Sequence, residues 1–350
     1  MSANEIYDVT IIGGGPAGLY SAFYAGLREM KTKIIEYQPF LGGKINVYPE
    51  KLIWDVGGLT PVTGEQLIRH LIQQGTTFDP TIVLREKVVS IAEEEGCFAL
   101  YTSSGRVHYS KTVIIAIGGG ILKPMKLQLE GAEKFEVTNL HYTVKSYAHF
   151  HNKTILISGG GNSALDWANE LSDVAKKVYL TYRKDSLKGH EATITNIQKQ
   201  GVVCLLNTEI ERLIAGDDHS AIERVALRYH EDNAVYELEI DDVIVCHGYE
   251  NEKELIHNSK VNIRMKDEYC IDGTPLSETS VPGIYAAGDV LKHDGKLYLI
   301  AGAFQDAANA VNRAKQFITP NAASYGMVSS HNDVFKERNK ELKMSLSIRT

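Results

Sequence analysis

The stretch VTIIGGGPAGLYSAFYAGL, residues 9–27, is an apolar run that ends in glycines and continues with apolar residues at helical spacing. A second stretch, ILISGGGNSALDWANELSD, residues 155–173, repeats this pattern. An apolar, β-branched run followed by glycines and a helical pattern predicts a strand, a tight turn and a helix. The sequence therefore predicts the same local structure at two places in one chain.

The glycine spacing of the first turn matches a dinucleotide-binding fingerprint. Gly13, Gly15 and Gly18 fit G-x-G-x-x-G, with Pro16 at the start of the helix. In such a turn the first glycine allows the bend, the second admits a pyrophosphate against bare backbone, and the third lets the helix pack on the strand. The next strand, KTKIIEY, reaches Glu36 about 20 residues later, where an acid accepts hydrogen bonds from an adenosine ribose. We interpret this unit as a nucleotide site rather than a glycine turn without a ligand.

The second turn has the G-x-G-x-x-A variant, and its residues in the turn and first helical positions are Gly159, Gly161, Asn162, Ser163 and Ala164. Its second strand, KKVYLTYRKD, carries no acid at the matching position. Basic residues follow instead: Arg183, Lys184 and Lys188. Such a cluster suits a ribose 2′-phosphate, so this unit is expected to bind NADPH rather than NADH. The alternative is that the three residues decorate an exposed strand end.

Composition narrows the class of protein. A length of 350 residues suggests about two domains, and 43% hydrophobic with 23% charged residues is typical of a globular protein. The net charge of −7 argues against binding to nucleic acid or to an anionic membrane. We find no signal-peptide pattern and no apolar run long enough to cross a bilayer, so a cytoplasmic location is expected.

Neither the cysteines nor the histidines suggest a metal centre. The four cysteines, Cys97, Cys204, Cys246 and Cys270, form no CxxC pair, which excludes a zinc knuckle and a local redox dithiol. The sequence His149-Phe150-His151 predicts two imidazoles on one face of a strand, and two ligands alone make a poor metal site. The sequence therefore predicts no bound metal.

Two later stretches give the chain a resemblance to thioredoxin-reductase-like flavoproteins. They are TVIIAIGGG (112–120) and TSVPGIYAAGDVL (279–291), followed by a helical pattern in KLYLIAGAFQDAANAVNRAKQFI (296–318). The resemblance implies an α/β fold of two doubly wound, Rossmann-like domains. The NADP-binding domain, residues 117–248, would be inserted into an FAD-binding domain formed by residues 1–116 and 249–350.

The chain departs from thioredoxin reductases at one place. Where they carry a CxxC shortly before the second glycine run, this chain reads NLHYTVKSYAHFHNKTILISGGG (139–161), without sulfur. The resemblance then implies that electrons leave from the flavin itself. Together with LGGKINVYPEKLIWDVGG (41–58) and a C-terminal extension past Pro320, this is similar to the ferredoxin–NADP reductases of the thioredoxin-reductase type.

The resemblance implies positions for the flavin contacts. Tyr48 would stack on the isoalloxazine, and the remaining contacts would come from Gly43, Lys44, Asp55, Val88, Leu122 and Asp289. In the tail, Val328, Ser329 and Ser330 match an aromatic-Ser-Thr triplet, so Ser330 keeps a hydroxyl while the ring cap is lost or is taken over by His331. Asp55 and His141 can equally be structural hydrogen-bonding residues.

The implied function is transfer of electrons from NADPH through FAD to ferredoxin or flavodoxin in single-electron steps. It needs no catalytic side chain, because the cofactor supplies the difficult chemistry. Relatives are homodimers, which implies the same here. The alternatives are a disulfide reductase that uses a partner's dithiol and a non-catalytic NADPH-sensing flavoprotein. Because ferredoxins and flavodoxins are acidic, a basic docking patch is expected, with candidates Arg28, Lys31, Lys33, Lys336, Arg338, Lys340 and Lys343.

Overall fold

The computed structural model describes residues 5–120, 123–249, 254–327, 331–336, 338–340 and 344. Leu122, Val328, Ser329, Ser330 and Lys343, which the sequence analysis singled out, lie outside the described residues. The chain divides into two compact units. Unit 1 contains Met1–Asn46, Leu52–Ile121 and Asn251–Thr350, and unit 2 contains Val47–Lys51 and Leu122–Glu250. Unit 2 is inserted into unit 1, and it includes the segment 47–51, which the resemblance assigned to the first domain.

Unit 1 is built on a mixed sheet with strand order β5-β2-β1-β8-β7-β6, and β18 pairs with the second half of β8. The parallel part consists of β1 (Ile6–Ile12), β2 (Thr32–Ile35), β5 (Thr81–Val83), β8 (Val107–Ile115) and β18 (Ile284–Ala286). β6 (Val88–Glu94) and β7 (Cys97–Thr102) extend it as antiparallel strands. All four residues of β2 are buried, as expected for a parallel strand covered on both faces.

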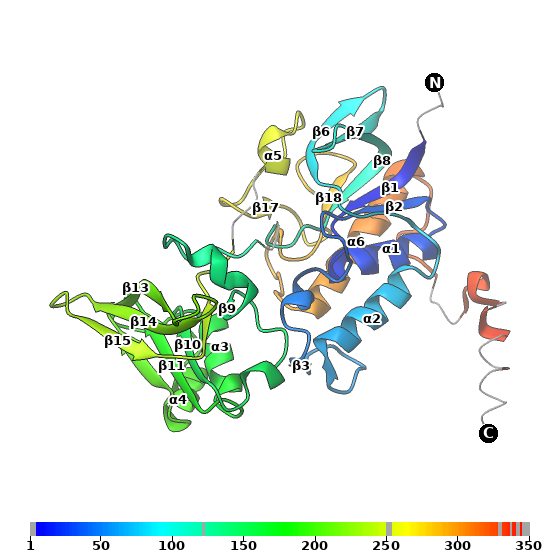
Figure 1. The fold of residues 1–350 in the computed structure, drawn as a ribbon. Helices are drawn as coiled ribbons and strands as arrows, with labels where there is room; N and C mark the ends of the chain where they lie inside the picture. The colour runs from blue at the N-terminus through cyan, green and yellow to red at the C-terminus, as the bar shows by residue number, and fades with distance from the viewer. Residues whose placement is uncertain are drawn as a thin grey trace. The chain divides into compact units, whose positions relative to one another are not determined.

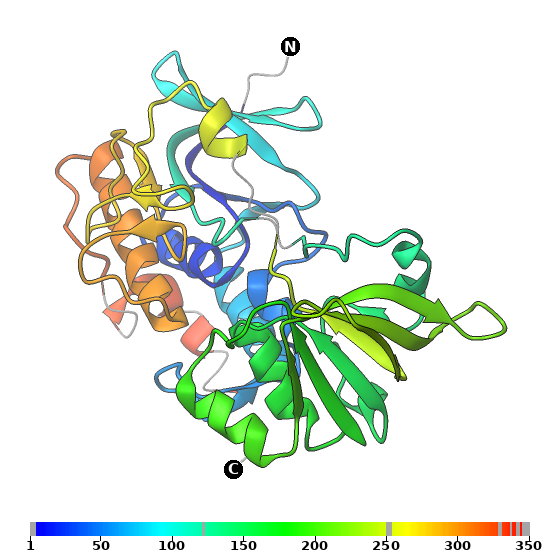
Figure 2. The same ribbon diagram turned by 90° about the vertical axis from the view of Figure 1, so that its left-hand side faces the viewer.

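Helices cover this sheet, as Figures 1 and 2 show. α1 (Pro16–Leu27) lies beside α6 (Ile300–Ile318) and α2 (Gly64–Gly75). Pro16 occupies the first turn of α1, where a missing N–H costs nothing. α2 begins at a capping box, in which Thr63 and Gln66 each accept the other's backbone N–H. The small elements of unit 1 are η1 (Gly43–Val47), β3 (Leu52–Ile53), β4 (Val62–Thr63), α5 (Glu254–Asn258), β17 (Ile271–Asp272), β19 (Leu291–Lys292) and η5 (Asp333–Phe335).

Unit 2 is built on a parallel sheet with strand order β12-β11-β10-β16-β9. These strands are β9 (Leu140–His141), β10 (Thr154–Ser158), β11 (Lys177–Tyr182), β12 (Val203–Leu206) and β16 (Asp242–Val245). The helical elements are η2 (Ala132–Val137), η3 (Ala148–Phe150), α3 (Asn162–Leu171) and α4 (Glu191–Lys199). An antiparallel meander of β13 (Thr208–Ala215), β14 (Ile222–Tyr229) and β15 (Val235–Glu239) completes the unit (Figure 1).

The parallel part of the unit 1 sheet and the unit 2 sheet share one arrangement around their first α-helix. In each, the strand after the first helix lies beside the strand before it, and a strand from later in the chain lies on the other side. This is the doubly wound arrangement, so the predicted α/β fold with one domain inserted into another is confirmed. Within the described residues, the helices lack the combination of length and hydropathy that a membrane span requires.

Two local predictions were wrong. His149-Phe150-His151 does not form a strand: it lies in and just after the short helix η3, so the two histidines do not share a strand face. Arg28 and Lys33 are buried instead of forming an exposed basic patch. The Arg28 guanidinium donates to Asn312 Oδ1 and to the Ala323 carbonyl, and Lys33 Nζ lies 3.2 Å from His108 Nδ1. These contacts come from distant parts of the sequence, which is why the local pattern did not reveal them.

Candidate nucleotide-binding sites

The first glycine turn lies at the carboxyl edge of the unit 1 sheet. Because β1, β8 and β18 are adjacent and parallel, the segments that follow them meet at this edge. Gly13 follows β1, residues 117–120 follow β8, and the Gly288-Asp289 pair follows β18. Open α/β sheets bind ligands at this edge, where the helix N-terminus attracts a phosphate.

The three glycines of the turn differ in how much room the protein leaves for a side chain. A Cβ on Gly13 would lie 2.4 Å from the Ala116 carbonyl oxygen, and one on Gly18 would lie 1.9 Å from the Gly13 carbonyl oxygen. A side chain at either position would therefore clash with the backbone, so this turn favours glycine at both. A Cβ on Gly15 would make only an ordinary contact, 3.6 Å from Gly43 Cα. The protein itself does not require glycine at position 15, which is the position expected to face a pyrophosphate.

Two further sequence candidates lie against this turn. Gly43 has φ +59°, and a Cβ there would approach within 2.8 Å of Gly15 Cα, so its backbone packs directly on the turn. The Glu36 carboxylate accepts the backbone N–H groups of Gly14 (2.6 Å) and Gln38 (2.7 Å). Burial raises the pKa of the Glu36 carboxyl. The structure thus brings the acid and the four predicted glycines, Gly13, Gly15, Gly18 and Gly43, together at this turn.

Asp289 is exposed at the same edge and is held there by residues that the sequence reasoning missed. The N–H of Gly288 donates to Asp306 Oδ2 at 3.0 Å, and its carbonyl accepts from Lys296 Nζ at 2.8 Å. Lys296 and Asp306 also form a buried ion pair. No sequence signal marks Asp306, which sits within the amphipathic pattern of α6. Asp289 lines a hollow together with Gly118, Gly119 and Tyr269.

The remaining residues that were predicted to contact the flavin differ in how far their side chains are exposed. Lys44, Asp55 and His331 are exposed. The Val88 side chain is buried in the core of unit 1, so this position could offer a ligand only its backbone. Tyr48 is partly buried against the core of unit 2, and only the rest of its ring could contact a flavin.

The second glycine turn occupies the corresponding edge of unit 2. Gly159 follows β10 with φ +149°, and a Cβ there would lie 2.5 Å from the Cys246 carbonyl oxygen. Ala164 is buried in the first turn of α3, where Asn162 and Ser163 are exposed. A Cβ on Gly161 would meet nothing within 4 Å. The second glycine of this motif faces open space, whereas Gly15 in unit 1 has one ordinary contact with Gly43.

The predicted basic cluster lies beside this turn. Arg183 and Lys184 directly follow β11, and the backbone N–H of Lys188 donates to the Gly160 carbonyl at 2.7 Å. All three side chains are exposed. Within the described part of the chain, no acidic side chain forms an ion pair with them. Their positive charge is therefore available to an anion at the carboxyl edge of the sheet.

A serine and a histidine at this edge had no distinctive sequence signal. Ser158 ends β10 and His247 follows β16, and Ser158 Oγ lies 2.8 Å from His247 Nε2. Burial, with a contribution from the nearby Arg183, lowers the pKa of His247. The imidazole is therefore neutral near pH 7 and can exchange a hydrogen bond with the hydroxyl without adding charge.

All four cysteines lie in the described part of the chain, and all are free. Burial is the largest cause of a raised pKa for each of the four thiols, Cys97, Cys204, Cys246 and Cys270. The pKa of Cys246 rises to about 12. Because the thiolate is the reactive form, these side chains are poorly suited to thiol–disulfide exchange.

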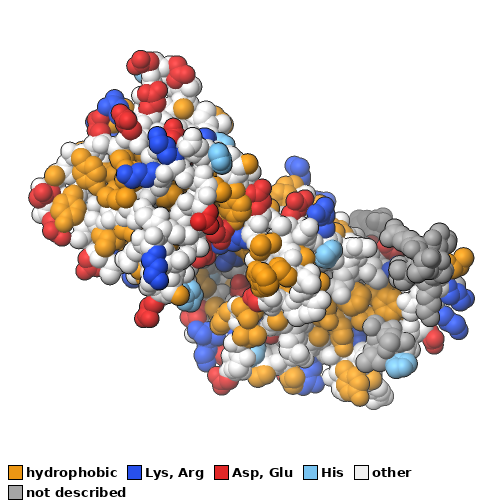
Figure 3. Space-filling model, turned by 90° about the horizontal axis from the view of Figure 1, so that it is seen from below, with side chains coloured by type: hydrophobic (Ala, Val, Ile, Leu, Met, Phe, Trp, Pro, Cys, Tyr) orange, Lys and Arg blue, Asp and Glu red, His pale blue; other side chains and the backbone are white. Residues whose placement is uncertain are grey.

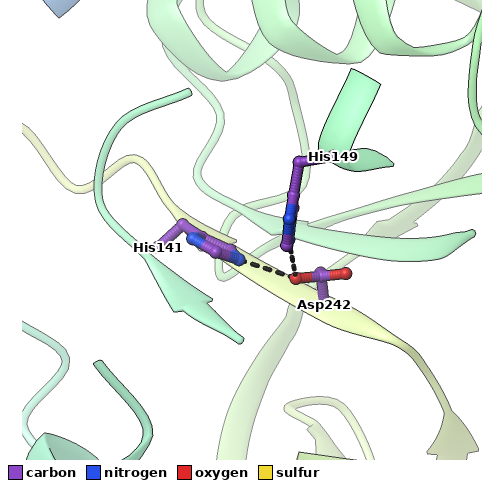
Figure 4. A group of neighbouring side chains, drawn as sticks. All are labelled: His141, His149 and Asp242. Carbon is purple, nitrogen blue, oxygen red and sulfur yellow. Dashed lines mark hydrogen bonds and ion pairs between the residues drawn. The ribbon is translucent and has the colours of Figure 1, made fainter. Parts of the chain in front are cut away.

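His141 does not belong to the residues that line the glycine turn of unit 2. It follows Leu140 in β9, beside β16, and its imidazole, that of His149 and the carboxylate of Asp242 converge at the start of β16 (Figure 4). It therefore has a structural partner in unit 2, consistent with the second interpretation that the sequence allowed.

Comparison with known proteins identifies the family. The family model for pyridine nucleotide-disulphide oxidoreductases matches residues 7–314. A ferredoxin–NADP reductase 1 of Bacillus cytotoxicus is 66% identical over 98% of this chain and 98% of its own length. The chain belongs to the thioredoxin-reductase-like ferredoxin–NADP reductase family. A second member, ferredoxin–NADP reductase 1 of Oceanobacillus iheyensis, is 60% identical over 97% of this chain and 98% of its own.

Solved structures support the fold of this reductase family member. Thioredoxin reductase of Lactococcus lactis is 26% identical, with a TM-score of 0.74 over 90% of this chain and 99% of its own. Thioredoxin reductase of T. acidophilum matches in fold with the same TM-score, 0.74, over 89% of this chain and 98% of its own. The chain is thus an oxidoreductase with the fold of a thioredoxin reductase and without that enzyme's CxxC.

Proposed function

We propose that this oxidoreductase passes electrons from NADPH, bound by unit 2, through FAD, bound by unit 1, to a one-electron carrier protein, ferredoxin or flavodoxin. When bound, FAD supplies the conversion between a two-electron donor and a one-electron acceptor. The observation that carries the proposal is that the chain combines two glycine turns of the nucleotide-binding type with four free cysteines, whose thiol pKa values are raised by burial. With no dithiol to receive electrons, the flavin is their point of departure. The relatives are named ferredoxin–NADP reductases, which supports ferredoxin as the carrier.

The residues of unit 1 have the task of binding and orienting FAD. The bare backbone at Gly15 and Gly43 gives the pyrophosphate room, and the N-terminus of α1 favours its charge. Glu36 is positioned to receive the ribose. Asp289, fixed through Gly288 by the Lys296–Asp306 pair, presents a carboxylate for the ribityl hydroxyls. Lys44, Asp55 and the tail residues Ser330 and His331 complete the proposed set in unit 1, and Tyr48 of unit 2 is proposed to stack on the flavin.

The residues of unit 2 have the task of selecting and holding NADPH. Gly159 and Gly161 shape the turn, and the exposed N-terminus of α3 adds backbone donors from Asn162 and Ser163. Arg183, Lys184 and Lys188 supply positive charge for the 2′-phosphate. The proposal extends to a homodimer that works in the cytoplasm.

Docking of the carrier is proposed at the C-terminal tail. Lys31 pairs with Glu5 at 2.8 Å, and Arg28 and Lys33 are buried, so the N-terminal basic group is a poor docking surface. Lys336, Arg338 and Lys340 are exposed. On the face that Figure 3 shows, basic side chains are interspersed with acidic ones, so steering of an acidic carrier depends on a local group of charges.

We expect carrier reduction to fall several-fold as salt is raised, because salt screens the encounter between opposite charges. Reduction of a small neutral dye should stay nearly constant. The variant Lys336→Gln/Lys340→Gln should lower the salt dependence of carrier reduction and leave dye reduction unchanged, as measured by steady-state rates at several ionic strengths.

Charge substitution is preferable to truncation of the tail here. The Phe335 ring stacks on Phe23 and packs at a tilt against Phe78, with ring centroids 6.5 and 5.5 Å away, so truncation would remove packing as well as charge. Lys31→Gln is the matched control. If salt changed the rates of carrier and dye reduction equally, in wild type and variant alike, the tail would not be part of the docking surface.

A further inference from the structure

A cluster of two imidazoles and one carboxylate lies in unit 2 at the edge of the sheet opposite the glycine turn. His141 Nε2 lies 2.6 Å and His149 Nε2 lies 2.9 Å from the same atom, Oδ1 of Asp242 (Figure 4). Asp242 begins β16, whereas Gly159 follows the end of the neighbouring parallel strand β10. Asp242, which anchors the cluster, therefore lies at the opposite end of these strands from the glycine turn of the proposed NADPH site.

We propose that His141, His149 and Asp242 form a binding site for one divalent transition-metal cation, with Zn²⁺ as the best match. Two imidazole nitrogens and a carboxylate oxygen are a common set of three zinc ligands, which leaves the fourth position for water. The three ligand atoms all lie within 4.8 Å of one another. The inference does not depend on the redox activity.

The ligand atoms are already close to the separation that a metal needs. Bonds of about 2.0–2.2 Å at tetrahedral angles place two ligand atoms about 3.3–3.5 Å apart. The present separations of 2.6 and 2.9 Å from Asp242 Oδ1 would have to open by less than about 1 Å. The partly exposed side chains of His141 and His149 can make this movement and leave a path for the ion.

The surroundings hold the ligands in position. The Asp242 side chain is 0% exposed, and a buried carboxylate requires compensating positive charge. The Phe150 ring packs edge-on against both imidazoles, with ring centroids 5.3 Å from His141 and 4.8 Å from His149. A buried aromatic ring that contacts both imidazoles limits their rotation, as is usual for the outer partners of metal ligands.

In the metal-free state, each Nε2 that faces the carboxylate oxygen carries a hydrogen, because a carboxylate only accepts. Metal binding uses the Nε2 lone pair, so the hydrogen on each Nε2 must leave that atom, and the metal-bound imidazole carries its N–H at Nδ1. The positive charge of Lys153 disfavours binding of a cation, because its Nζ lies 2.9 Å from Asp242 Oδ2 and 3.3 Å from His149 Nε2. Its side chain is 34% exposed and can turn into solvent.

The bound ion would tie together three segments of unit 2, namely β9, η3 and β16. Binding to the folded state alone raises the free energy of unfolding by RT ln(1 + c/Kd), where c is the free metal concentration, so stability rises with the logarithm of that concentration. We therefore expect Zn²⁺ to raise the unfolding temperature of the enzyme. This gives a readout that is independent of catalysis.

The test uses the full-length, FAD-loaded protein without a histidine tag, stripped of metal with a chelator. Co²⁺ titration should produce the visible absorption of a low-symmetry, nitrogen- and oxygen-ligated site, saturating at one ion per chain, and Zn²⁺ should displace it. His149→Gln should weaken binding by more than about a hundredfold, because it removes a ligand and not merely an outer partner. Lys153→Met should strengthen binding by about tenfold, because it removes a nearby positive charge.

His151→Gln is the matched control, since His151 is an exposed histidine two residues from His149 and outside the cluster. Circular dichroism of each variant checks that it is folded. The proposal is overturned if Co²⁺ shows no saturable one-to-one binding. It is equally overturned if His149→Gln and His151→Gln bind the ion alike, or if Zn²⁺ shifts the unfolding temperature of wild type no more than that of His149→Gln.

Discussion

Replacing Gly161 by alanine is expected to raise the KM for NADPH by about tenfold to a hundredfold while leaving the unfolding temperature nearly unchanged. In the protein alone, a Cβ at this position meets nothing within 4 Å, and the backbone needs no left-handed conformation there. The added methyl group therefore costs the fold little. It would occupy the space in which the pyrophosphate lies against the backbone, and crowding of this kind costs about 1–3 kcal/mol.

Gly159→Ala gives the contrasting result. Its Cβ would lie 2.5 Å from the Cys246 carbonyl oxygen at φ +149°, so this variant should lose stability as well as NADPH binding. Thermal unfolding and steady-state kinetics of the two variants separate the demands of the fold from those of the ligand. Unchanged NADPH kinetics in Gly161→Ala would mean that no ligand approaches this turn.

Arg183→Ala is expected to weaken the use of NADPH by about tenfold or more, with little change for NADH. A hydrogen bond to a charged group contributes about 1.5–3 kcal/mol, and the 2′-phosphate is the only group that distinguishes the two cofactors. Arg183 is exposed and lies at the carboxyl end of β11. The measurement is kcat/KM for both cofactors at constant ionic strength.

Lys176→Ala provides the control for the loss of one positive charge. Lys176 is exposed and lies just before β11, at the end of the strand away from the glycine turn. It should leave the preference for NADPH intact. Equal losses with NADPH and NADH in Arg183→Ala, or a similar loss in Lys176→Ala, would argue against recognition of the 2′-phosphate at this position.

The strand–turn–helix units could be predicted from the sequence because their signals are local. Gly13, Gly18 and Gly159 are required by backbone contacts within the turn or with the neighbouring strand, and such contacts impose a fixed spacing. The basic residues after β11 were predictable for the same reason. In a parallel sheet, the residues that follow neighbouring strands meet at one edge.

Other features depended on contacts between distant segments and left no local signal. Arg28 is satisfied by Asn312 and Ala323, nearly 300 positions away, so its burial could not be inferred from the basic residues around it. His149 was paired with its neighbour His151 in sequence, but the structure pairs it with His141 and Asp242 instead. The support of Gly288 by Asp306 likewise appears only when α6 packs beside β18.

The central claim is that electrons pass from the flavin to a carrier protein without any thiol of this chain. The most direct test is anaerobic, NADPH-dependent reduction of ferredoxin, followed through cytochrome c, by wild type and by a variant in which Cys97, Cys204, Cys246 and Cys270 are all alanine. The account predicts that ferredoxin is reduced at the same rate per bound FAD by both proteins. Failure of wild type to reduce ferredoxin while it reduces a disulfide, or loss of ferredoxin reduction in the FAD-loaded cysteine-free variant, would contradict it.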